Sequence, residues 1–369
     1  MSGAAVADAV DWADWLRLEQ TAGVGAETAR RLLAAFGLPP QIFAAPYAAL
    51  IQVVSEKIAT ALSSAPGPAL QRQIELTADW CARPGNQLLT LADAAYPRAL
   101  LEIPDPPVLI YLKGRTALLE APTIAVVGSR NATTQGIRNA EQFSEALSCA
   151  GLTISSGLAA GIDAAAHTGA LRGAGATVAV IGTGADIVYP ARNRSLAHLI
   201  ADGGCILSEY ALGMPAVASN FPRRNRLISG LAKGVLVVEA AAQSGSLITA
   251  RMAAEQGREV FAIPGSIHAP LSKGCHQLIK QGAKLVETAQ DILDELQFSA
   301  AAVRSAVAGA QPAEPGQGLL ALLGYDPLHP DALAQRSGLD AASLSAQLLE
   351  LELAGRIETL AGGLLRRLA

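Results

Sequence analysis

The spacing of hydrophobic residues divides the chain into differently patterned regions. Apolar residues recur at helical spacing over residues 11–80, and residues 15–33 predict two helices joined by a glycine-containing hairpin. Residues 123–296 instead alternate short β-branched runs with helical stretches. After residue 318 the pattern predicts three short helices and a terminal hairpin. The chain is therefore expected to contain a helical, an α/β and a second small unit.

The α/β region carries six short apolar runs, each of which predicts a buried strand. These runs are residues 124–127, 152–155, 177–181, 205–208, 235–238 and 260–263. The helical stretches of crossover length between them are residues 135–149, 163–172, 195–201 and 246–256. Buried strands joined by helices form parallel sheets with right-handed connections. The fold class is thus α/β, an extended Rossmann-like, doubly wound parallel sheet.

Composition refines these boundaries into four segments. A small helical domain of the sterile-alpha-motif or helix-hairpin-helix kind is expected over residues 1–85, and the Rossmann-like domain over 86–297. Within the latter, residues 83–114 are interrupted by prolines and predict a connector that leads into an edge strand at 108–112. Residues 298–317 are biased to Ala, Pro and Gly, which is typical of a linker. Three helices and a hairpin over 318–369 predict a winged helix.

Charge and cysteine usage exclude several classes of protein. The net charge of −4 argues against coating nucleic acid by bulk electrostatics, so any DNA site must be local. Cys81, Cys149, Cys205 and Cys275 stand singly, which indicates neither a disulfide framework nor a zinc site. No signal-peptide pattern and no apolar run of membrane-spanning length is present. We expect a cytoplasmic protein without membrane insertion.

The first predicted strand ends in Gly128, Ser129 and Arg130, shortly before a helix begins. Ligands bind at this carboxyl edge of a doubly wound sheet, where helix N–H groups attract phosphate and an arginine can pair with it. The spacing does not match G-x-G-x-x-G, so no nicotinamide cofactor is expected. The alternative is a tight turn with Arg130 in a surface ion pair.

The second strand leads into another glycine-rich loop at Gly157, followed by Asp163 and His167 one turn apart. This loop joins the first at the same sheet edge. Asp163 and His167 form either an acid/base pair or, more simply, ordinary helix-start and core residues.

The strongest chemical cluster lies in residues 220–233, which contain four basic residues and no acidic one. Its candidate DNA-binding residues are Phe221, Arg223, Arg224, Asn225 and Arg226. Arginines can follow phosphates while Phe221 stacks on a base, and stacking tolerates any base sequence, so single-stranded DNA is favoured. The alternative is that Arg224 and Arg226 anchor their helix to the sheet loops and Phe221 fills the core.

A third polar turn, Ser244 and Gly245, opens a helix at the same edge. No base and orienting acid are spaced to activate a serine, so a hydrolase with a serine nucleophile is not favoured.

The order and spacing of these motifs resemble the DprA/Smf family. The resemblance runs from about residue 96 to 296, through Gly128-Ser129-Arg130, residues 156–163, 221–230 and 245–250. Family precedent places Arg130, Phe221, Arg224 and Arg226 on DNA. One departure is Lys273-Gly274-Cys275-His276, where the family usually has Asn after its Gly, so His276 receives no family role.

The resemblance implies a non-enzymatic protein of natural transformation and competence. Such a protein protects incoming single-stranded DNA, loads the RecA recombinase on it and acts as a homodimer. The amino-terminal hairpin at residues 22–25, helped by Arg30 and Arg31, resembles DNA-backbone-binding hairpins, or else the module serves packing. The helix over 341–354 lacks Lys and Arg, which favours a protein contact for the winged helix.

Two other classes of function remain open from the residues. One is a nucleotide-binding hydrolase on a related Rossmann-like fold, using Asp163 or Glu239 at a strand end. The other is a protein that only bridges partners.

Overall fold

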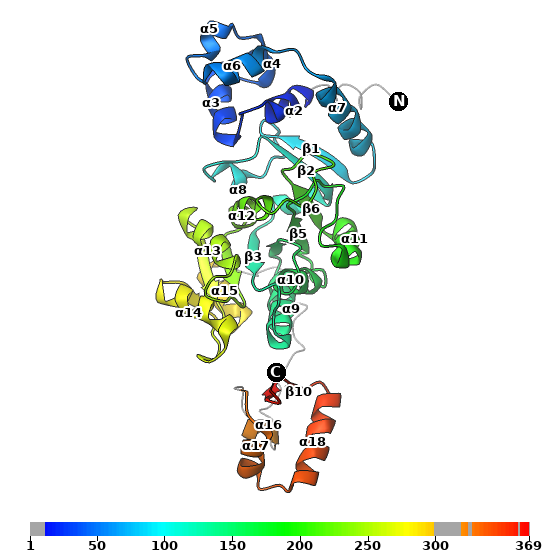
Figure 1. Cartoon of the computed structure of the whole chain (residues 1–369), viewed down its shortest axis with the longest axis vertical. Coiled ribbons are helices and arrows are strands. Elements are labelled where there is room, and N and C mark those ends of the chain that lie inside the picture. Colours follow the sequence, from blue (N-terminus) through cyan, green and yellow to red (C-terminus); the bar gives the residue numbers. More distant parts are fainter. Residues whose placement is uncertain (1–11, 299–318, 324–326, 361, 369) are drawn as a thin grey trace.

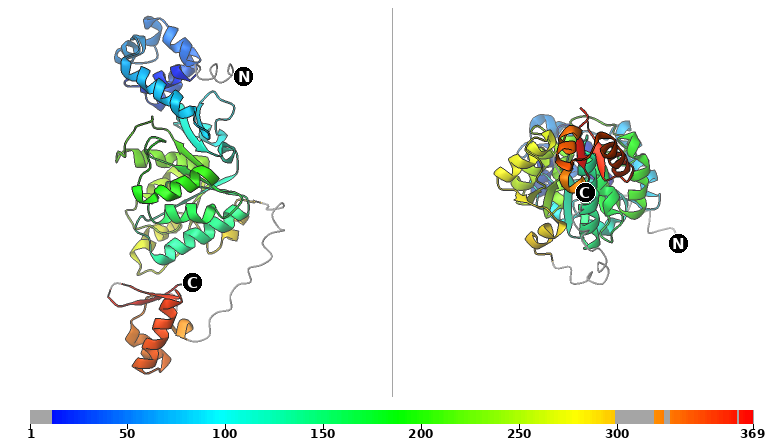
Figure 2. Two further views of the ribbon diagram at one scale, coloured as in Figure 1. Left: turned by 90° about the vertical axis from the view of Figure 1, so that its right-hand side faces the viewer. Right: turned by 90° about the horizontal axis from the view of Figure 1, so that it is seen from below.

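A computed structural model describes residues 12–298, 319–323, 327–360 and 362–368. Helices of the amino-terminal unit lie at one end of the molecule, the central sheet in the middle, and the carboxyl-terminal unit at the other end (Figure 1). A view turned by a quarter shows the same order along the long axis (Figure 2).

The amino-terminal unit consists of short helices that pack around tryptophan and leucine side chains. Its helices are α2 (Ala13–Gln20), α3 (Ala26–Phe36), α4 (Pro39–Ala44), α5 (Tyr47–Leu50), α6 (Glu56–Ser63) and α7 (Pro68–Cys81). Their buried residues form one cluster that also includes residues of the adjoining sheet. Trp80, for example, packs against Tyr111 of the sheet in a T-shaped arrangement, with ring centroids 5.9 Å apart and planes at 70°. The helical unit therefore shares its core with the sheet.

The central sheet has nine strands in the described part of the chain. They are β1 (Asn86–Thr90), β2 (Leu109–Gly114), β3 (Thr123–Val127), β4 (Thr153–Ser156), β5 (Thr177–Val180), β6 (Cys205–Ser208), β7 (Gly234–Val237), β8 (Glu259–Ala262) and β9 (Lys284–Leu285). Their order is β1-β2-β6-β5-β4-β3-β7-β8-β9, and all pairs from β6 to β9 are parallel. The predicted doubly wound parallel sheet is confirmed, and each of the six expected strands is present.

The prediction of an edge strand at residues 108–112 was wrong. β2 pairs antiparallel with β6 on one side and with β1 on the other, from Asn86 opposite Lys113 to Thr90 opposite Leu109. β1 lies in the stretch expected to be a connector. Only the last three of its five residues are buried, so its sequence carries little of the apolar alternation that marks a strand.

Helices cover both faces of the sheet. They are α8 (Arg98–Leu101), α9 (Thr134–Cys149), α10 (Ile162–Ala170), α11 (Arg194–Gly203), α12 (Asn220–Leu231), α13 (Ser246–Glu255), α14 (Lys273–Lys280) and α15 (Ala289–Glu295). In β3, Ala125 and Val127 share a core with α12 and α13, whereas Ile124 and Val126 share one with α9 and α10. This alternation follows from the two-residue period of a strand, and it explains why the strands are apolar throughout.

The carboxyl-terminal unit is the predicted winged helix. It consists of α16 (Leu319–Leu323), α17 (Pro330–Ser337), α18 (Ala341–Leu353) and the hairpin of β10 (Ile357–Thr359) and β11 (Leu365–Arg367). Leu333, Leu344 and Ile357 lie in its small core. The predicted linker lies outside the described residues apart from Phe298. None of the helices in the described segments is long and apolar enough to cross a membrane.

Candidate nucleic-acid interface

A cavity of about 460 Å³ opens at the carboxyl ends of β3 and β7. Its walls come from the loop after β3, the start of α12 and the turn that leads into α13. Parallel strands bring their carboxyl ends to one edge, so loops distant in sequence converge there. Eight of the predicted DNA-binding residues line it: Gly128, Ser129, Arg130, Phe221, Arg224, Asn225, Ser244 and Gly245. The other three, Gly157, Arg223 and Arg226, are not among the lining residues.

An exposed cation and two aromatic rings adjoin this cavity. The guanidinium carbon of Arg130 lies 5.8 Å from the ring centroid of Phe221, within reach of a cation–π interaction. Phe221 also meets Tyr189, with ring centroids 5.4 Å apart and planes tilted by 39°. Tyr189 is 49% exposed. The three side chains form a surface that can stack on unpaired bases.

Tyr189 is the functional candidate that sequence reasoning missed. Tyr189 lies in the stretch after β5, whose two arginines, Arg192 and Arg194, do not line the cavity. The available signal was an aromatic residue that follows a strand at the carboxyl edge of the sheet. Its partner Phe221 lies in a different loop, so the pair exists only in the fold.

The amino terminus of α9, where dinucleotides bind in many Rossmann-like folds, is occupied by the protein itself. The Glu239 carboxylate accepts hydrogen bonds from the backbone N–H of Thr133, at 2.9 Å, and from the Thr133 hydroxyl. Gly136 makes the room, since a Cβ there would lie 2.3 Å from the Glu239 carboxyl carbon. Burial raises the pKa of Glu239, and the bonds from Thr133 oppose the shift. Glu239 therefore caps a helix, which gives no support to the hydrolase hypothesis.

The loop before α10 is likewise held by an internal carboxylate. Asp163 is buried and accepts from the backbone N–H groups of Gly157, at 3.1 Å, and Ala159, at 3.4 Å. Burial raises the pKa of Asp163, and the neighbouring Arg224 guanidinium opposes that shift. The Asp163 carboxylate and the Arg224 guanidinium therefore both stabilise the loop before α10.

His167 has a separate structural role. Its Nε2 accepts from the backbone N–H of Leu158 at 3.2 Å, so the ring proton is on Nδ1 and is donated to the Thr177 hydroxyl at 2.7 Å. Burial lowers the pKa of His167 to about 3, so the ring is neutral at pH 7. Neither ring nitrogen is bonded to Asp163, so the arrangement does not support an acid/base pair.

The amino terminus of α13 differs from those of α9 and α10. It has no acidic residue in its first turn, and its N-cap residue, Gly245, makes no side-chain cap. A Cβ on Gly245 would meet nothing within 4 Å, and its φ of −61° suits any residue. Packing therefore does not require this glycine. The N–H groups of Ser246, Leu247 and Ile248 donate to oxygens of Ser244 and Gly245 within the turn, but no carboxylate occupies this helix start. A helix start that is open in this sense, beside Arg130, is suited to attract a phosphate.

Arg224 supports the floor of the cavity. It is only 3% exposed and donates to the carbonyl of Gly157, at 2.7 Å, and to that of Val180. Burial lowers its pKa to about 10, and Asp163 opposes the shift, so the guanidinium stays charged at pH 7. A Cβ on Gly157 would lie 2.6 Å from both Arg224 Nη1 and Asp163 Oδ2. Gly157 is thus required by packing, and Arg224 ties two loops to α12.

Arg226 is buried in an ion-pair network away from the cavity. It is 5% exposed and binds Glu209 with both terminal nitrogens, at 2.8 and 2.7 Å. Its Nε donates to Asp105 at 2.7 Å. Arg223 reaches the same Glu209 at 3.6 Å with a side chain that is 55% exposed. The basic cluster is therefore split, and Arg224 and Arg226 take the anchoring positions that the sequence left open as an alternative.

In the two terminal units, the features expected to meet a partner differ in kind. In the amino-terminal helical unit, Arg30 donates to the carbonyl of Pro104 and Arg31 to that of Val53. On α18 of the winged helix, Leu349 and Leu353 are 58% and 81% exposed. The two arginines that the sequence offered beside the amino-terminal hairpin are thus used in contacts within the protein.

Family models match most of the chain. The model described as DNA recombination-mediator protein A matches residues 87–297, and the DprA winged helix domain model matches residues 303–363. Among curated relatives, protein Smf of Escherichia coli is 44% identical over 304 residues, which is 80% of this chain and 81% of the relative.

Solved structures agree in fold. The chain is similar to DNA processing protein A of Streptococcus pneumoniae, with a TM-score of 0.62, 38% identity, and coverage of 77% of this chain and 97% of that one. It is also similar to DNA processing protein A of Helicobacter pylori, solved to describe its single-stranded DNA binding mode. That match has a TM-score of 0.53 and 30% identity, and it covers 57% of this chain and 96% of that one.

Proposed function

The chain belongs to the DNA recombination-mediator protein A family, and from this premise we propose that it binds single-stranded DNA at the carboxyl edge of its central sheet. One observation carries the proposal. An exposed guanidinium, two adjoining aromatic rings and an open helix start meet at a cavity, and the protein's own carboxylates fill the other two helix starts. The single-stranded DNA binding of the Helicobacter pylori relative supports it.

The proposed binding mode assigns phosphate and base to different walls of the cavity. A phosphate lies between Arg130 and the positive end of the α13 dipole, where Gly245 leaves room for the backbone of DNA. Bases stack on Phe221 and Tyr189, which contributes on the order of 1–3 kcal/mol per base without reading sequence. Only unpaired bases can reach these rings, so single strands bind better than duplex.

The predicted site is narrowed accordingly. Gly128, Ser129, Arg130, Phe221, Asn225, Ser244 and Gly245 remain proposed DNA contacts. Arg223 is proposed to contact DNA just outside the cavity, because its side chain is exposed. Gly157, Arg224 and Arg226 are proposed to hold the loops and α12 in place.

The cellular role follows as part of the same proposal. The protein holds incoming single strands during natural transformation, acts as a homodimer and loads RecA on the DNA. Because the net charge is −4, DNA is held only by a few local cations, and salt can weaken this binding. Weak binding of this kind suits a protein that must release DNA to another protein. The loading role is tested by RecA filament formation on protein-coated DNA. The homodimer is tested by sedimentation of the free protein. If RecA is not accelerated, the loading role is rejected while DNA binding stands.

Titration of labelled single-stranded and duplex oligonucleotides across a salt series tests the binding proposal. Wild type is compared with Arg130→Gln and Phe221→Leu, and the matched control is Arg172→Gln, since Arg172 is an exposed arginine held by Glu141 and Glu145 outside the cavity. We expect each cavity variant to lose about tenfold or more in affinity, and Arg130→Gln to reduce the salt slope by about 0.7. Unchanged binding in both cavity variants would reject the site.

A further inference from the structure

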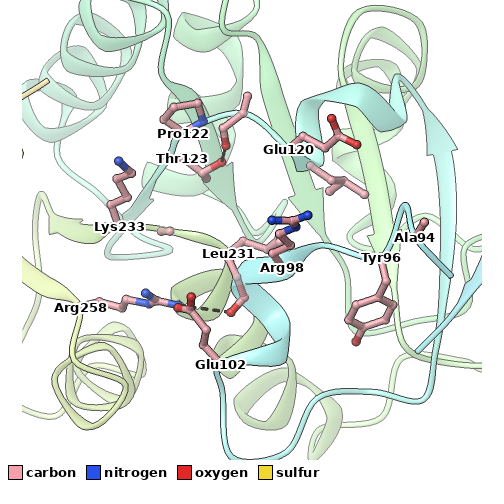
Figure 3. Close-up of a pocket in the computed structure, with 14 residues that line it drawn as sticks. Ala94, Tyr96, Arg98, Glu102, Glu120, Pro122, Thr123, Leu231, Lys233 and Arg258 are labelled. Atoms are coloured by element: carbon pink, nitrogen blue, oxygen red, sulfur yellow. Dashed lines mark hydrogen bonds and ion pairs between the residues drawn. The ribbon is translucent and has the colours of Figure 1, made fainter. Parts of the chain in front are cut away.

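A second cavity, of about 530 Å³, lies at the opposite edge of the sheet (Figure 3). Its lining includes Thr123 at the start of β3 and Lys233 just before β7, so it adjoins the amino ends of these two strands. Residues of α8, the η1 turn (Thr116–Leu119) and the last turn of α12 complete the wall. The volume is in the range of pockets that hold ligands. The proposed DNA contacts do not account for it.

The rim carries two cationic side chains that have no partner in the described part of the protein. Arg98 and Lys233 are exposed, and neither side chain makes a hydrogen bond or ion pair with any residue in the described ranges. A third cation of the lining, Arg258, is paired with Glu102 at 2.7 Å. Figure 3 shows Arg98, Lys233 and Arg258 coming from different elements around the same hollow, with Glu120 on the wall above Arg98. The rim has more positive than negative groups.

The floor beneath these charges is apolar. Leu119 and Leu231 are buried at 7% exposure each and line the cavity together with Ala232. Tyr96 presents its ring there, and its hydroxyl donates to the carbonyl of Pro107 at 2.7 Å. A ligand that fits must therefore combine negative charge with an apolar group.

Nucleic acid matches this combination poorly. The unpaired cations Arg98 and Lys233 stand beside the carboxylates Glu102 and Glu120, so the rim can balance a few negative charges but not a chain of phosphates. The longest helix that reaches the cavity, α12, ends there at Leu231. The negative end of its dipole also disfavours the binding of many anionic groups. A segment with one to three carboxylates and a neighbouring aliphatic side chain matches both the unpaired cations and the floor.

We propose that this cavity binds an acidic peptide segment of a protein partner. A carboxylate of the segment lies between Arg98 and Lys233, and the adjacent apolar side chain packs on Leu119 and Leu231. α12 runs from the DNA cavity at Phe221 to this cavity at Leu231, so the two ligands occupy opposite ends of one helix. DNA and the partner can therefore be bound together. The proposal does not depend on the DNA proposal.

The test uses fluorescein-labelled Asp-Glu-Asp-Leu-Leu and the full-length protein at low salt, measured by anisotropy. Two control peptides remove one property each: Asn-Gln-Asn-Leu-Leu most of the charge and Asp-Glu-Asp-Ser-Ser the apolar side chains. We expect both to bind at least about tenfold more weakly than the acidic, apolar peptide. The double variant Arg98→Gln/Lys233→Gln should lose at least about tenfold for the acidic peptide, whereas Arg172→Gln should bind it as wild type does.

Both altered side chains are exposed, so the double variant should unfold like wild type, and its oligonucleotide affinity should be unchanged. Absent peptide binding at millimolar peptide, or binding that the double variant retains, would overturn the proposal. Loss of oligonucleotide binding in the double variant would instead assign the cavity to nucleic acid and also overturn it.

Discussion

Replacement of Arg226 by methionine should destabilise the fold and spare the DNA site. Arg226 and Glu209 are 5% and 7% exposed, and the pair is joined by two hydrogen bonds. Methionine fills much of the arginine volume but leaves the Glu209 carboxylate buried without its main partner. The nearest remaining cation is Arg223, at 3.6 Å.

The expected loss can be set from these contacts. Removing one partner of a buried ion pair costs about 3–5 kcal/mol. Arg223 can move toward Glu209, and the Asp105 side chain, 44% exposed, regains water. We therefore expect about 3 kcal/mol, seen as a lower urea midpoint with an unchanged slope in circular dichroism.

A matched double variant separates an unpaired charge from a lost DNA contact. In Arg226→Met/Glu209→Leu both partners are apolar, and most of the lost stability should return. Both variants should bind single-stranded DNA within about threefold of wild type, a difference of about 0.7 kcal/mol, at temperatures where they are folded, because Arg226 does not line the DNA cavity. The reasoning is refuted if Arg226→Met unfolds like wild type but no longer binds DNA.

Three further predictions address other parts of the molecule. Burial raises the pKa of Glu19 to about 7, above its unfolded value of 4.5, so its contribution to stability is full below pH 4.5 and is lost as pH rises through about 7. Glu19→Gln should thus flatten the fall in thermal stability over that window, and a wild-type slope in the variant would contradict this. Gly245→Val should fold normally and weaken DNA binding at least about fivefold, whereas Gly128→Ala should destabilise the fold, because its Cβ would lie 2.6 Å from Ile162. The glycine argument is wrong if both variants behave alike. Tyr189→Leu should weaken binding about fivefold or more while Tyr189→Phe retains it, and equal titration curves for the two would remove Tyr189 from the stacking surface.

The parallel sheet was predictable because its strands are buried on both faces and therefore apolar along their whole length. Their carboxyl ends meet at one edge by topology, so the loops at Gly128 and Gly245 could be brought together without coordinates. β1 could not be found this way, since its polar first residues hide the alternation. Its position in the sheet is set by pairing with β2.

The roles of the arginines were not predictable from the cluster that contains them. Successive residues of α12 face different directions, and Arg226 is held by Glu209, 17 residues away in sequence, and by Asp105, 121 residues away. The same holds for the filled helix start of α9, where Glu239 caps Thr133 from 106 residues away. Such distant partners are brought together only by the fold. They cannot be identified from the residues that are adjacent in sequence.

Photocrosslinking tests the location of the DNA site most directly. A single-stranded oligonucleotide that carries 5-iododeoxyuridine is irradiated with the full-length protein, and the crosslinked peptides are identified by mass spectrometry. The account predicts crosslinks to Phe221 or Tyr189, which present their rings at the sheet edge. Crosslinks confined to the amino-terminal hairpin at residues 22–25 or to the winged helix would contradict it.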